Sequence, residues 1–545
     1  MAKVDLTKYG IDGTIEIVHN PIYEHLFKAE TDPANEGFEK GELTTTGAIS
    51  VKTDVFTRRS PKDRYIVKDS VTENTIWWDG NINKPVAVNV WNDLKALSLQ
   101  QLNTAKNILQ MKHLMIFMLL SVTFPLIAQI ETVRDKTTKQ VYVKVEPLKP
   151  EIKHYELFVW KSETPADCPF TQSKAYSQIK FLGVKSGFHF ADTWYPTWGE
   201  DDLLYSPYTD GVCWRLDGSS ERSWSFGETA TTGHAVIEGD DPLNLVIYSL
   251  GLQVASSKPY EGRYPCGSLM YNDIWYYGTY CLGPSGGAKY GDMVYNWPWL
   301  GPFVGFRIST DKGRSWKNCP HTPEKALFGE SGWNGYPVKI GSPHFVDFGK
   351  NMEYSPDGKA YMVAHGADIN DPKPRFWNAS WITGDNVYLL RVVPSVENIN
   401  DASKWEFYAG KDASGNALWT NDFSQIKPLL EWNNNMGCVT VTYNAAIKKY
   451  LMCVTDGGNT CAKMHTYILE SDSLTGEWKL VSYLKNFGEQ AYFVNIPSKY
   501  ISNDGKTMWL WYSGNFAVGW NGAEIKVNPE GSHYGLVMQK IQILK

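Results

Sequence analysis

The first 167 residues contain no cysteine, and all eight cysteines of this 545-residue chain lie between Cys168 and Cys461. Tryptophan is similarly uneven, because only three of the 22 precede residue 110. Such a change along one chain favours two parts with different origins, the first from a reducing compartment and the second from one that tolerates disulfides. The eight cysteines fit either a disulfide or free thiols.

Other absences narrow the functional classes. The chain has no Cys-x-x-Cys pair and no histidine-rich tract, so the sequence predicts no metal-binding residues of the common zinc type. No cofactor is expected to be required, although a structural calcium ion stays open. The net charge of −6 gives no indication of a nucleic-acid partner or of an anionic membrane surface.

A single apolar segment separates the two parts. It begins Met-Lys-His at Met111 and is then apolar from Leu114 to Ala128, a run of 15 residues. This length is short for a membrane span and suits the central region of a secretory signal peptide. A helix buried between two domains is the alternative. We interpret residues 105–130 as a junction, and the signal-like segment predicts a periplasmic or extracellular location for the part that follows.

Residues 1–104 are interpreted as a small α/β fragment. Thr14–Val18 is strand-like, turn clusters follow, and Tyr23–Ala29 is expected to be a short helix. Four motifs in this fragment together resemble the N-terminus of ATP-dependent phosphoenolpyruvate carboxykinases: Asp5–Gly10, Glu16–Pro21, Arg59–Asp63 and Trp77–Trp78.

The resemblance implies one substrate contact and lacks the rest of the machinery. In that family the arginine of a Thr-Gly-Arg-Ser-Pro-Lys-Asp loop contacts the substrate carboxylate, which is the position of Arg59, although Arg58 replaces the glycine. Phosphoryl transfer also needs a glycine-rich loop that ends in Gly-Lys-Thr/Ser, and a carboxylate for Mg²⁺. The chain has no such loop, since Gly283–Tyr290 matches only in part. The fragment is therefore expected to be inactive as a carboxykinase.

Residues 131–545 consist of short strand-like runs between Gly, Asp and Asn turns, without a convincing amphipathic helix of more than three turns. They are expected to form a mainly all-β domain, such as a sandwich, barrel or propeller. The strand-like runs are Val141–Val145, Ala235–Glu238, Leu243–Tyr248, Asp273–Tyr280, Phe303–Ile308, Ala360–Ala364, Val387–Val393, Cys438–Tyr443, Tyr450–Val454, Thr466–Glu470, Trp478–Tyr483 and Met508–Tyr512.

Three related turns favour the propeller. Ser309–Trp316 has the Asp-box pattern Ser-x-Asp-x-Gly-x-x-Trp, in which the tryptophan packs beneath a hairpin turn, and Ser355–Lys359 and Ser502–Lys506 are degenerate relatives. The 46 residues from Ser309 to Ser355 are close to the length of one four-stranded blade. We predict a β-propeller of five to seven blades.

Polar and aromatic residues gather in segments that would follow early strands. The inner strands of a propeller can bring such groups together at the axis, even when they are remote in sequence. Tryptophan and tyrosine beside carboxylates suit a sugar, whose ring face stacks and whose hydroxyls need hydrogen bonds. The same residue types also form turns and pack blades. The candidate substrate-binding residues are Trp194, Arg263, Tyr264, His344, Asp347 and Tyr492.

One mechanism that fits is glycoside hydrolysis. It needs a carboxylic acid and a carboxylate on either side of the scissile bond. Asp192 as base, Asp241 as charge tuner and Glu489 as acid would form such a set. The abundance of carboxylates favours this mechanism slightly.

The alternative mechanism is elimination by a lyase that acts on a uronic acid. A lyase needs a histidine or tyrosine to move the proton and an arginine or histidine to neutralise the substrate carboxylate. His234, Tyr264, Arg263 and His344 would supply these groups. A non-catalytic propeller that binds glycans is the alternative from another functional class.

The second part also carries a looser resemblance. Asp192–Pro196, Gly233–Ala235, the turn at Ser309 and Tyr492–Lys499 look like secreted Bacteroidetes-type propellers, which include family 43-like glycosidases, sialidase-like proteins and uronate lyases. The resemblance implies a polysaccharide or oligosaccharide partner, and it does not fix the substrate. A monomer without a membrane span is expected.

Overall fold

The computed structural model describes residues 148–283, 300–332, 337–368, 380–456, 464–488, 491–514 and 534–545, together with the backbone of the strands outside those ranges. The chain divides into one unit of residues 1–149 with 214–220, and another of residues 150–213 with 221–545. Within the described part there is no α-helix.

The N-terminal unit contains antiparallel strands. Strands β1, β2 and β5 form one sheet, and β3–β4, β6–β7 and β8–β9 form pairs. The strand expected at Thr14–Val18 is β2, whereas Tyr23–Ala29, Arg59 and the apolar segment from Leu114 to Ala128 lie outside the described residues. The bounds are β1 (Ala2–Asp5), β2 (Thr14–Val18), β3 (Glu30–Thr31), β4 (Glu39–Lys40), β5 (Ser50–Lys52), β6 (Arg64–Lys68), β7 (Thr75–Asp79), β8 (Thr132–Arg134) and β9 (Val141–Val143).

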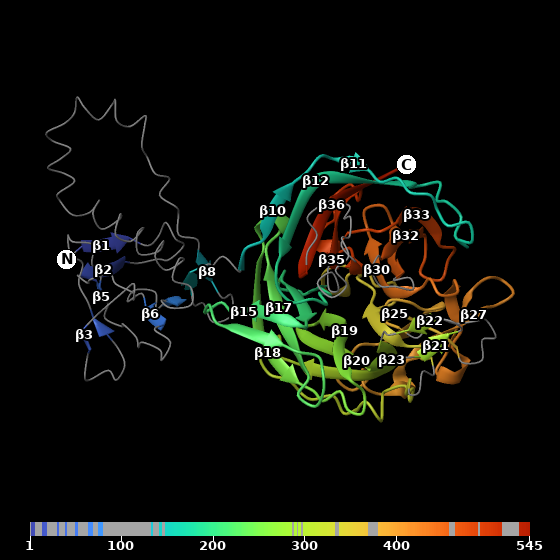
Figure 1. The fold of residues 1–545 in the computed structure, drawn as a ribbon, viewed down its shortest axis with the longest axis horizontal. Coiled ribbons are helices and arrows are strands. Elements are labelled where there is room, and N and C mark those ends of the chain that lie inside the picture. Colours follow the sequence, from blue (N-terminus) through green and yellow to red (C-terminus); the bar gives the residue numbers. More distant parts are fainter. Residues whose placement is uncertain are drawn as a thin grey trace. The chain divides into compact units, whose positions relative to one another are not determined.

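The larger unit is a five-bladed β-propeller, in which five antiparallel sheets follow one another around an axis (Figure 1). Blade 1 contains β13 (Thr197–Trp198), β14 (Leu204–Tyr208), β17 (Thr231–Glu238) and β18 (Val246–Val254), with the 3₁₀ helix η3 (Pro242–Asn244). The chain between β14 and β17 forms a separate hairpin of β15 (Gly211–Trp214) and β16 (Ser220–Ser223). Blade 2 contains β19 (Gly262–Tyr271), β20 (Ile274–Ser285) and β23 (Pro298–Ser309), with the hairpin β21 (Ala288–Tyr290) and β22 (Met293–Tyr295).

Blade 3 carries an extension beyond its first three strands. It contains β24 (Gly341–Phe345), β25 (Ala360–Gly366), β26 (Asn386–Val392), β27 (Glu406–Lys411), β28 (Ala417–Thr420) and β29 (Pro428–Glu431), with η5 (Lys350–Met352), η6 (Ala402–Lys404) and η7 (Phe423–Gln425). Blade 4 contains β30 (Gly437–Asn444), β31 (Lys449–Asp456), β32 (His465–Ser471) and β33 (Lys479–Leu484).

Blade 5 joins the two ends of the propeller sequence. Its inner strand is β34 (Tyr492–Asn495), followed by η8 (Ser498–Tyr500) and by the antiparallel strands β35 (Thr507–Ser513) and β36 (Leu536–Leu544). The outer strands come from the beginning of the propeller: β12 (Gln178–Phe188), which pairs with β36, and then β10 (Glu151–His154) and β11 (Phe158–Val159). Pairing of β12 with β36 closes the ring and removes two exposed sheet edges.

The inner strands run parallel to one another around the axis. A parallel bridge joins Asp347, just after β24, to Thr442 of β30. In the same register the hydroxyl of Thr442 donates to the carbonyl of Ile496, just after β34, over 2.6 Å. All inner strands therefore begin at one end of the ring, which we call the N-terminal face, and end at the other, the C-terminal face.

The hydrophobic pattern predicts the strands well, because each sheet is covered on both sides. Strand β25 is buried at every residue, and β31 is buried at all but its first residue. Their segments Ala360–Ala364 and Tyr450–Val454 are therefore continuous apolar runs in the sequence. The five blades lie within the predicted range of five to seven.

The three related turns do not occupy equivalent positions. Ser309–Trp316 follows β23, the third strand of its blade, whereas Ser355–Lys359 and Ser502–Lys506 lie between the first and second strands of theirs. In the first turn the hydroxyl of Ser309 donates to Asp311 over 2.7 Å and accepts from the backbone of Gly313 over 2.7 Å. The 46-residue spacing is therefore not the repeat of one blade.

Ring closure predicts a large loss of stability on truncation of Ile541, which is fully buried between Phe181 of β12 and Met508 of β35. Ile541→Ala should reduce the free energy of unfolding by about 2–5 kcal/mol, because the cavity in the closing blade cannot collapse fully. Val254→Ala, at a position that is 71% exposed, should change it by no more than about 0.5 kcal/mol. Urea unfolding followed by tryptophan fluorescence measures both, and equal midpoints for the two variants would contradict this role of β36.

Candidate functional site

Asp192 lies at the N-terminal face, directly between β12 and the inner strand β13. Its backbone exchanges two hydrogen bonds with Thr209, at 2.9 and 3.0 Å. Ala191 and Thr193 on either side have φ values of 50° and 66°, in the left-handed region that costs side chains roughly 1 kcal/mol or more. A Cβ on Gly211 would lie 2.5 Å from the Ala191 backbone, so glycine is required there. The chain therefore holds Asp192 in a strained, fixed position.

Hydroxyl groups surround the carboxyl of Asp192. The Tyr492 hydroxyl donates to Oδ2 over 2.6 Å, and the Thr193 hydroxyl donates to Oδ1 over 2.9 Å. Tyr534, just before β36, also hydrogen-bonds to this carboxyl. Only 8% of Asp192 is exposed. The strand ends of the closing blade thus supply most of its partners.

A second carboxyl, Asp210, follows β14 beside the first. The backbone N–H and the hydroxyl of Ser225 donate to its two oxygens over 2.9 and 2.8 Å. The Tyr534 hydroxyl donates to the Asp210 backbone carbonyl over 2.5 Å, so one tyrosine contacts both aspartates. Asp210 is partly exposed. Tyr264 on β19 is also partly exposed, and its side chain hydrogen-bonds to Ser225.

Burial shifts the titration of both carboxyls, and the charge of Asp210 adds to the shift of Asp192. Burial and the charge on Asp210 raise the pKa of Asp192 to about 8, against the hydrogen bonds from Tyr492, Thr193 and Tyr534. Burial raises the pKa of Asp210, and the two bonds from Ser225 oppose this rise. Burial and the charge of Asp210 therefore keep Asp192 protonated at neutral pH.

His234 and Asp241 lie away from this pair. His234 on β17 is buried inside the blade, where its Nε2 accepts a hydrogen bond from Trp316 Nε1 over 3.2 Å. Asp241 is exposed and caps η3, accepting from the Leu243 backbone over 3.0 Å. It follows the end of β17 that is opposite the end nearest Asp192, so it lies at the C-terminal face.

The predicted Trp194 and Arg263 are close to Asp192 in the chain or fold, but their side chains are engaged in packing. Trp194 is 1% exposed and stacks on Tyr208 with ring centroids 5.5 Å apart. The guanidinium of Arg263 donates to Thr279 over 3.0 Å and to the Ser256 carbonyl over 3.2 Å. Neither side chain presents its polar atoms to Asp192 through a hydrogen bond.

His344 and Asp347 lie on the axis. The His344 ring is 3.8 Å from that of Tyr195, and burial lowers its pKa well below the usual range, so it is neutral. Asp347 accepts two hydrogen bonds from Ser498 and one from the Gly349 backbone. The axial cavity beside them has a volume of about 40 Å³, whereas sites for small-molecule ligands usually measure roughly 300–1,000 Å³. A sugar ring therefore does not fit at this level of the axis.

Among the residues predicted from sequence, the structure brings Asp192, Tyr264 and Tyr492 together at the N-terminal face. Glu489 lies outside the described residues, three positions before Tyr492. Sequence reasoning missed Asp210 and Tyr534. Asp210 stands in a Thr-Asp-Gly sequence, which indicates only a turn, and Tyr534 is 342 positions from Asp192 (534 − 192), so no local pattern joins them.

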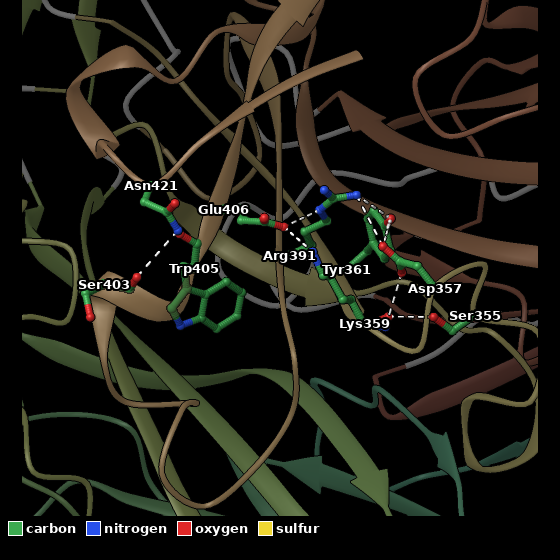
Figure 2. A network of polar contacts seen from close by, with 9 residues as sticks. All are labelled: Ser355, Asp357, Lys359, Tyr361, Arg391, Ser403, Trp405, Glu406 and Asn421. Carbon is green, nitrogen blue, oxygen red and sulfur yellow. Dashed lines mark hydrogen bonds and ion pairs between the residues drawn. The ribbon is translucent and has the colours of Figure 1, made fainter. Parts of the chain in front are cut away.

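A second cluster of acidic residues, on blade 3, has the opposite electrostatic character. Arg391 bonds to Glu406 over 2.7 Å and to Asp357 over 3.3 Å, and Lys359 also bonds to Glu406. Figure 2 shows these contacts. Although burial opposes them, these cations lower the pKa of Glu406. Arg391 also lies over the Trp419 ring at 3.8 Å. This network links the strands β25–β28 and favours the ionised form of Glu406.

Within the described residues, no three His, Cys, Asp or Glu side chains are grouped so as to hold a metal ion, and a structural calcium ion stays a prediction. The same residues include no helix long and apolar enough to cross a membrane. The seven described cysteines are free, and Cys461 lies outside the description.

The altered pKa of Asp192 predicts how stability depends on pH. Its folded pKa of about 8 exceeds the ordinary 3.8, so its contribution to stability is complete below about pH 4 and is lost as pH rises through 8. Asp192→Asn stays neutral throughout, so the Tm of the variant minus that of the unmodified chain should increase from pH 5 to pH 8.

Differential scanning fluorimetry in matched low-salt buffers measures this difference. Asp504→Asn is the control, because Asp504 is exposed and its lowered pKa keeps it ionised in both states over this range. A Tm difference for Asp192→Asn that is constant between pH 5 and pH 8 would contradict the assigned titration.

Three solved structures are similar in fold to this chain. A GH43_1 enzyme from Xanthomonas citri is 12% identical with a TM-score of 0.35, over 66% of this chain and 88% of that chain. A family 117 glycoside hydrolase from Zobellia galactanivorans is 10% identical with a TM-score of 0.33, over 73% and 91%. The endo-arabinase from Bacteroides thetaiotaomicron is 10% identical with a TM-score of 0.34, over 65% and 95%.

A family model described as phosphoenolpyruvate carboxykinase matches residues 15–126. The match confirms the resemblance of the N-terminal part and continues into the apolar segment that begins at Met111. The chain therefore joins a segment similar to phosphoenolpyruvate carboxykinase to a five-bladed β-propeller.

Proposed function

We propose that the propeller is a glycoside hydrolase whose active site lies at the N-terminal face around Asp192. The observation that carries this proposal is a buried carboxyl, protonated at neutral pH, beside a second carboxyl whose charge raises its pKa. Glycoside hydrolysis requires one carboxylic acid and one carboxylate with separated pKa values. The similarity to glycosidase structures is consistent with this proposal, but the proposal does not rest on it because the TM-scores are low.

Asp192 is proposed as the general acid. A carboxyl with a pKa of about 8 carries its proton at neutral pH and can donate it to the leaving glycosidic oxygen. This assignment reverses the role of base that its sequence context suggests, because burial and the neighbouring Asp210 charge favour the protonated form. The Tyr492 hydroxyl, whose own pKa is raised well above the usual range, stays protonated and fixes the carboxyl's orientation.

Asp210 is proposed to maintain the protonated state of Asp192 through its charge, the tuning role that the sequence suggests for Asp241. Its two hydrogen bonds from Ser225 hold that charge in place. Glu489 stays a prediction for the carboxylate that activates water or attacks the sugar, with the acid role moved to Asp192.

Asp192→Asn should lower kcat by roughly 10²–10⁴-fold on any glycan that the unmodified chain cleaves, because the amide cannot donate an acidic proton. Asp504→Asn, in an exposed turn on the C-terminal face, should leave kcat unchanged. The assay uses the full chain and a panel of polysaccharides and oligosaccharides, with products identified by mass.

Each alternative gives a different result in the same assay. Products that together have gained one water per cleavage indicate hydrolysis, and products without added water that absorb as unsaturated uronates indicate a lyase. A glycan that binds without turnover indicates a binding protein. Turnover of Asp192→Asn within threefold of the unmodified chain would exclude Asp192 as the general acid.

A further inference from the structure

A short segment beside the two carboxyls presents unusual aromatic exposure. Trp224 is 52% exposed and Phe226 is 41% exposed, and their ring centroids are 5.5 Å apart. Most large aromatic side chains of the described residues are buried in the blades. Two neighbouring exposed rings keep apolar surface in contact with water in the folded chain. Such exposed apolar surface is typical of a binding site.

The segment is attached firmly to two blades. The Trp224 backbone N–H donates to the Thr231 hydroxyl of β17 over 2.9 Å, and the Thr231 N–H donates to the Trp224 carbonyl over 2.7 Å. On the other side, Phe226 forms an antiparallel bridge with Gly262 of β19. These bonds fix the backbone at the boundary between blades 1 and 2, so both rings are presented with little conformational freedom to lose on binding.

The same backbone connects the rings to the carboxyl pair. Ser225, between the two aromatic residues, donates both of its hydrogen bonds to Asp210. The two aromatic residues therefore flank, along the chain, the residue that holds the Asp210 carboxyl. The Phe226 ring lies edge to face with Tyr264, at 6.3 Å, and Tyr264 hydrogen-bonds to Ser225.

We propose that Trp224, Phe226 and Tyr264 form a stacking subsite for a neutral sugar unit adjacent to the one that is cleaved. This inference rests on the proposed function and adds to it that the preferred substrate is an oligosaccharide or polysaccharide. Aromatic rings bind the apolar face of a sugar, while the carboxyls and hydroxyls nearby accept and donate hydrogen bonds to its edge.

The electrostatics of the site favour a neutral sugar. Among the described residues, the groups that set the pKa values of Asp192 and Asp210 are a carboxyl, hydroxyls and the Ser225 backbone N–H, and none of them is a cation. The nearby guanidinium of Arg263 is bonded to Thr279 and to a backbone carbonyl instead. A uronate would place a second negative charge beside that of Asp210, and no cation among the described groups around the pair would neutralise it, which disfavours its binding.

Substrates of different length test the subsite. The probes are neutral oligosaccharides of two to six units built from xylose, arabinose, galactose, glucose or mannose, with the matching nitrophenyl glycosides of one unit. Trp224→Ala in the full chain should raise KM for the longest cleaved oligosaccharide about tenfold, the value of a lost aromatic stacking contact, and leave the one-unit glycoside unchanged. Trp224→Phe should restore most of the affinity.

Tyr354→Ala is the matched control, because Tyr354 is 45% exposed and packs beside Tyr443 at the C-terminal face. It should change neither KM. An equal effect of Trp224→Ala on long and short substrates, or no effect on either, overturns the subsite while the proposed function stands. Faster cleavage of an oligogalacturonide than of every neutral probe overturns the preference for neutral sugars. If the unmodified chain cleaves no glycan of either kind, the proposed function fails as well.

Discussion

Pairing of β12 with β36 is the constraint on which the rest of the propeller depends. It joins residues 178–188 to residues 536–544, so the ring closes only when the first and last strands of the propeller meet in one sheet. The candidate site is built at this closure. Asp192 follows the end of β12 and Tyr492 begins β34 in the same blade, and their side chains form a 2.6 Å hydrogen bond across 300 positions of sequence. Closure of the ring therefore also brings Asp192, the proposed acid, to the Tyr492 hydroxyl that donates a hydrogen bond to it.

The electrostatics follow from this arrangement. The two acid clusters of the propeller differ in their neighbours rather than in their own chemistry. On blade 3, Arg391 and Lys359 neutralise Glu406 and keep it ionised. At the N-terminal face, Asp192 and Asp210 have hydroxyl partners and each other, so one of them retains a proton. The left-handed backbone at Ala191 and Thr193 is tolerated because the surrounding strands hold it, which is common where side-chain position matters for chemistry.

Much of the fold could be predicted from the sequence, because strands buried on both sides carry runs of four or more apolar residues. The runs predicted at Ala360–Ala364 and Tyr450–Val454 lie within β25 and β31. The closing blade could not be predicted, because β12 and β36 are separated by most of the propeller sequence. A hydrophobic pattern indicates that a segment is a strand, but not which other strand it pairs with. The spacing of the turns at Ser309 and Ser355 suggests a repeat that the topology does not have, because a Ser-x-Asp turn fits hairpins at any position in a blade.

The candidate site was predictable only in part. A polar residue type identifies a candidate but not the direction of its side chain. His234 and Arg263 are as polar as Asp192, and the structure packs them between strands. Asp210 resembles any turn-forming aspartate until the fold places it beside Asp192. The exposed Trp224 is one tryptophan of 22, and exposure, which distinguishes it, is a property of the folded chain.

The central claim is that Asp192 holds a proton at neutral pH, and its carboxyl carbon reports this directly. Aspartate labelled with ¹³C at the carboxyl in the full chain, with Asp192→Asn to assign the resonance, allows an NMR titration from pH 3 to pH 10. The account predicts an inflection near pH 8 for Asp192, with a smaller step from the titration of the neighbouring Asp210. A single inflection near pH 4 would contradict it, because Asp192 would then be an ordinary ionised carboxylate that cannot act as the proposed acid.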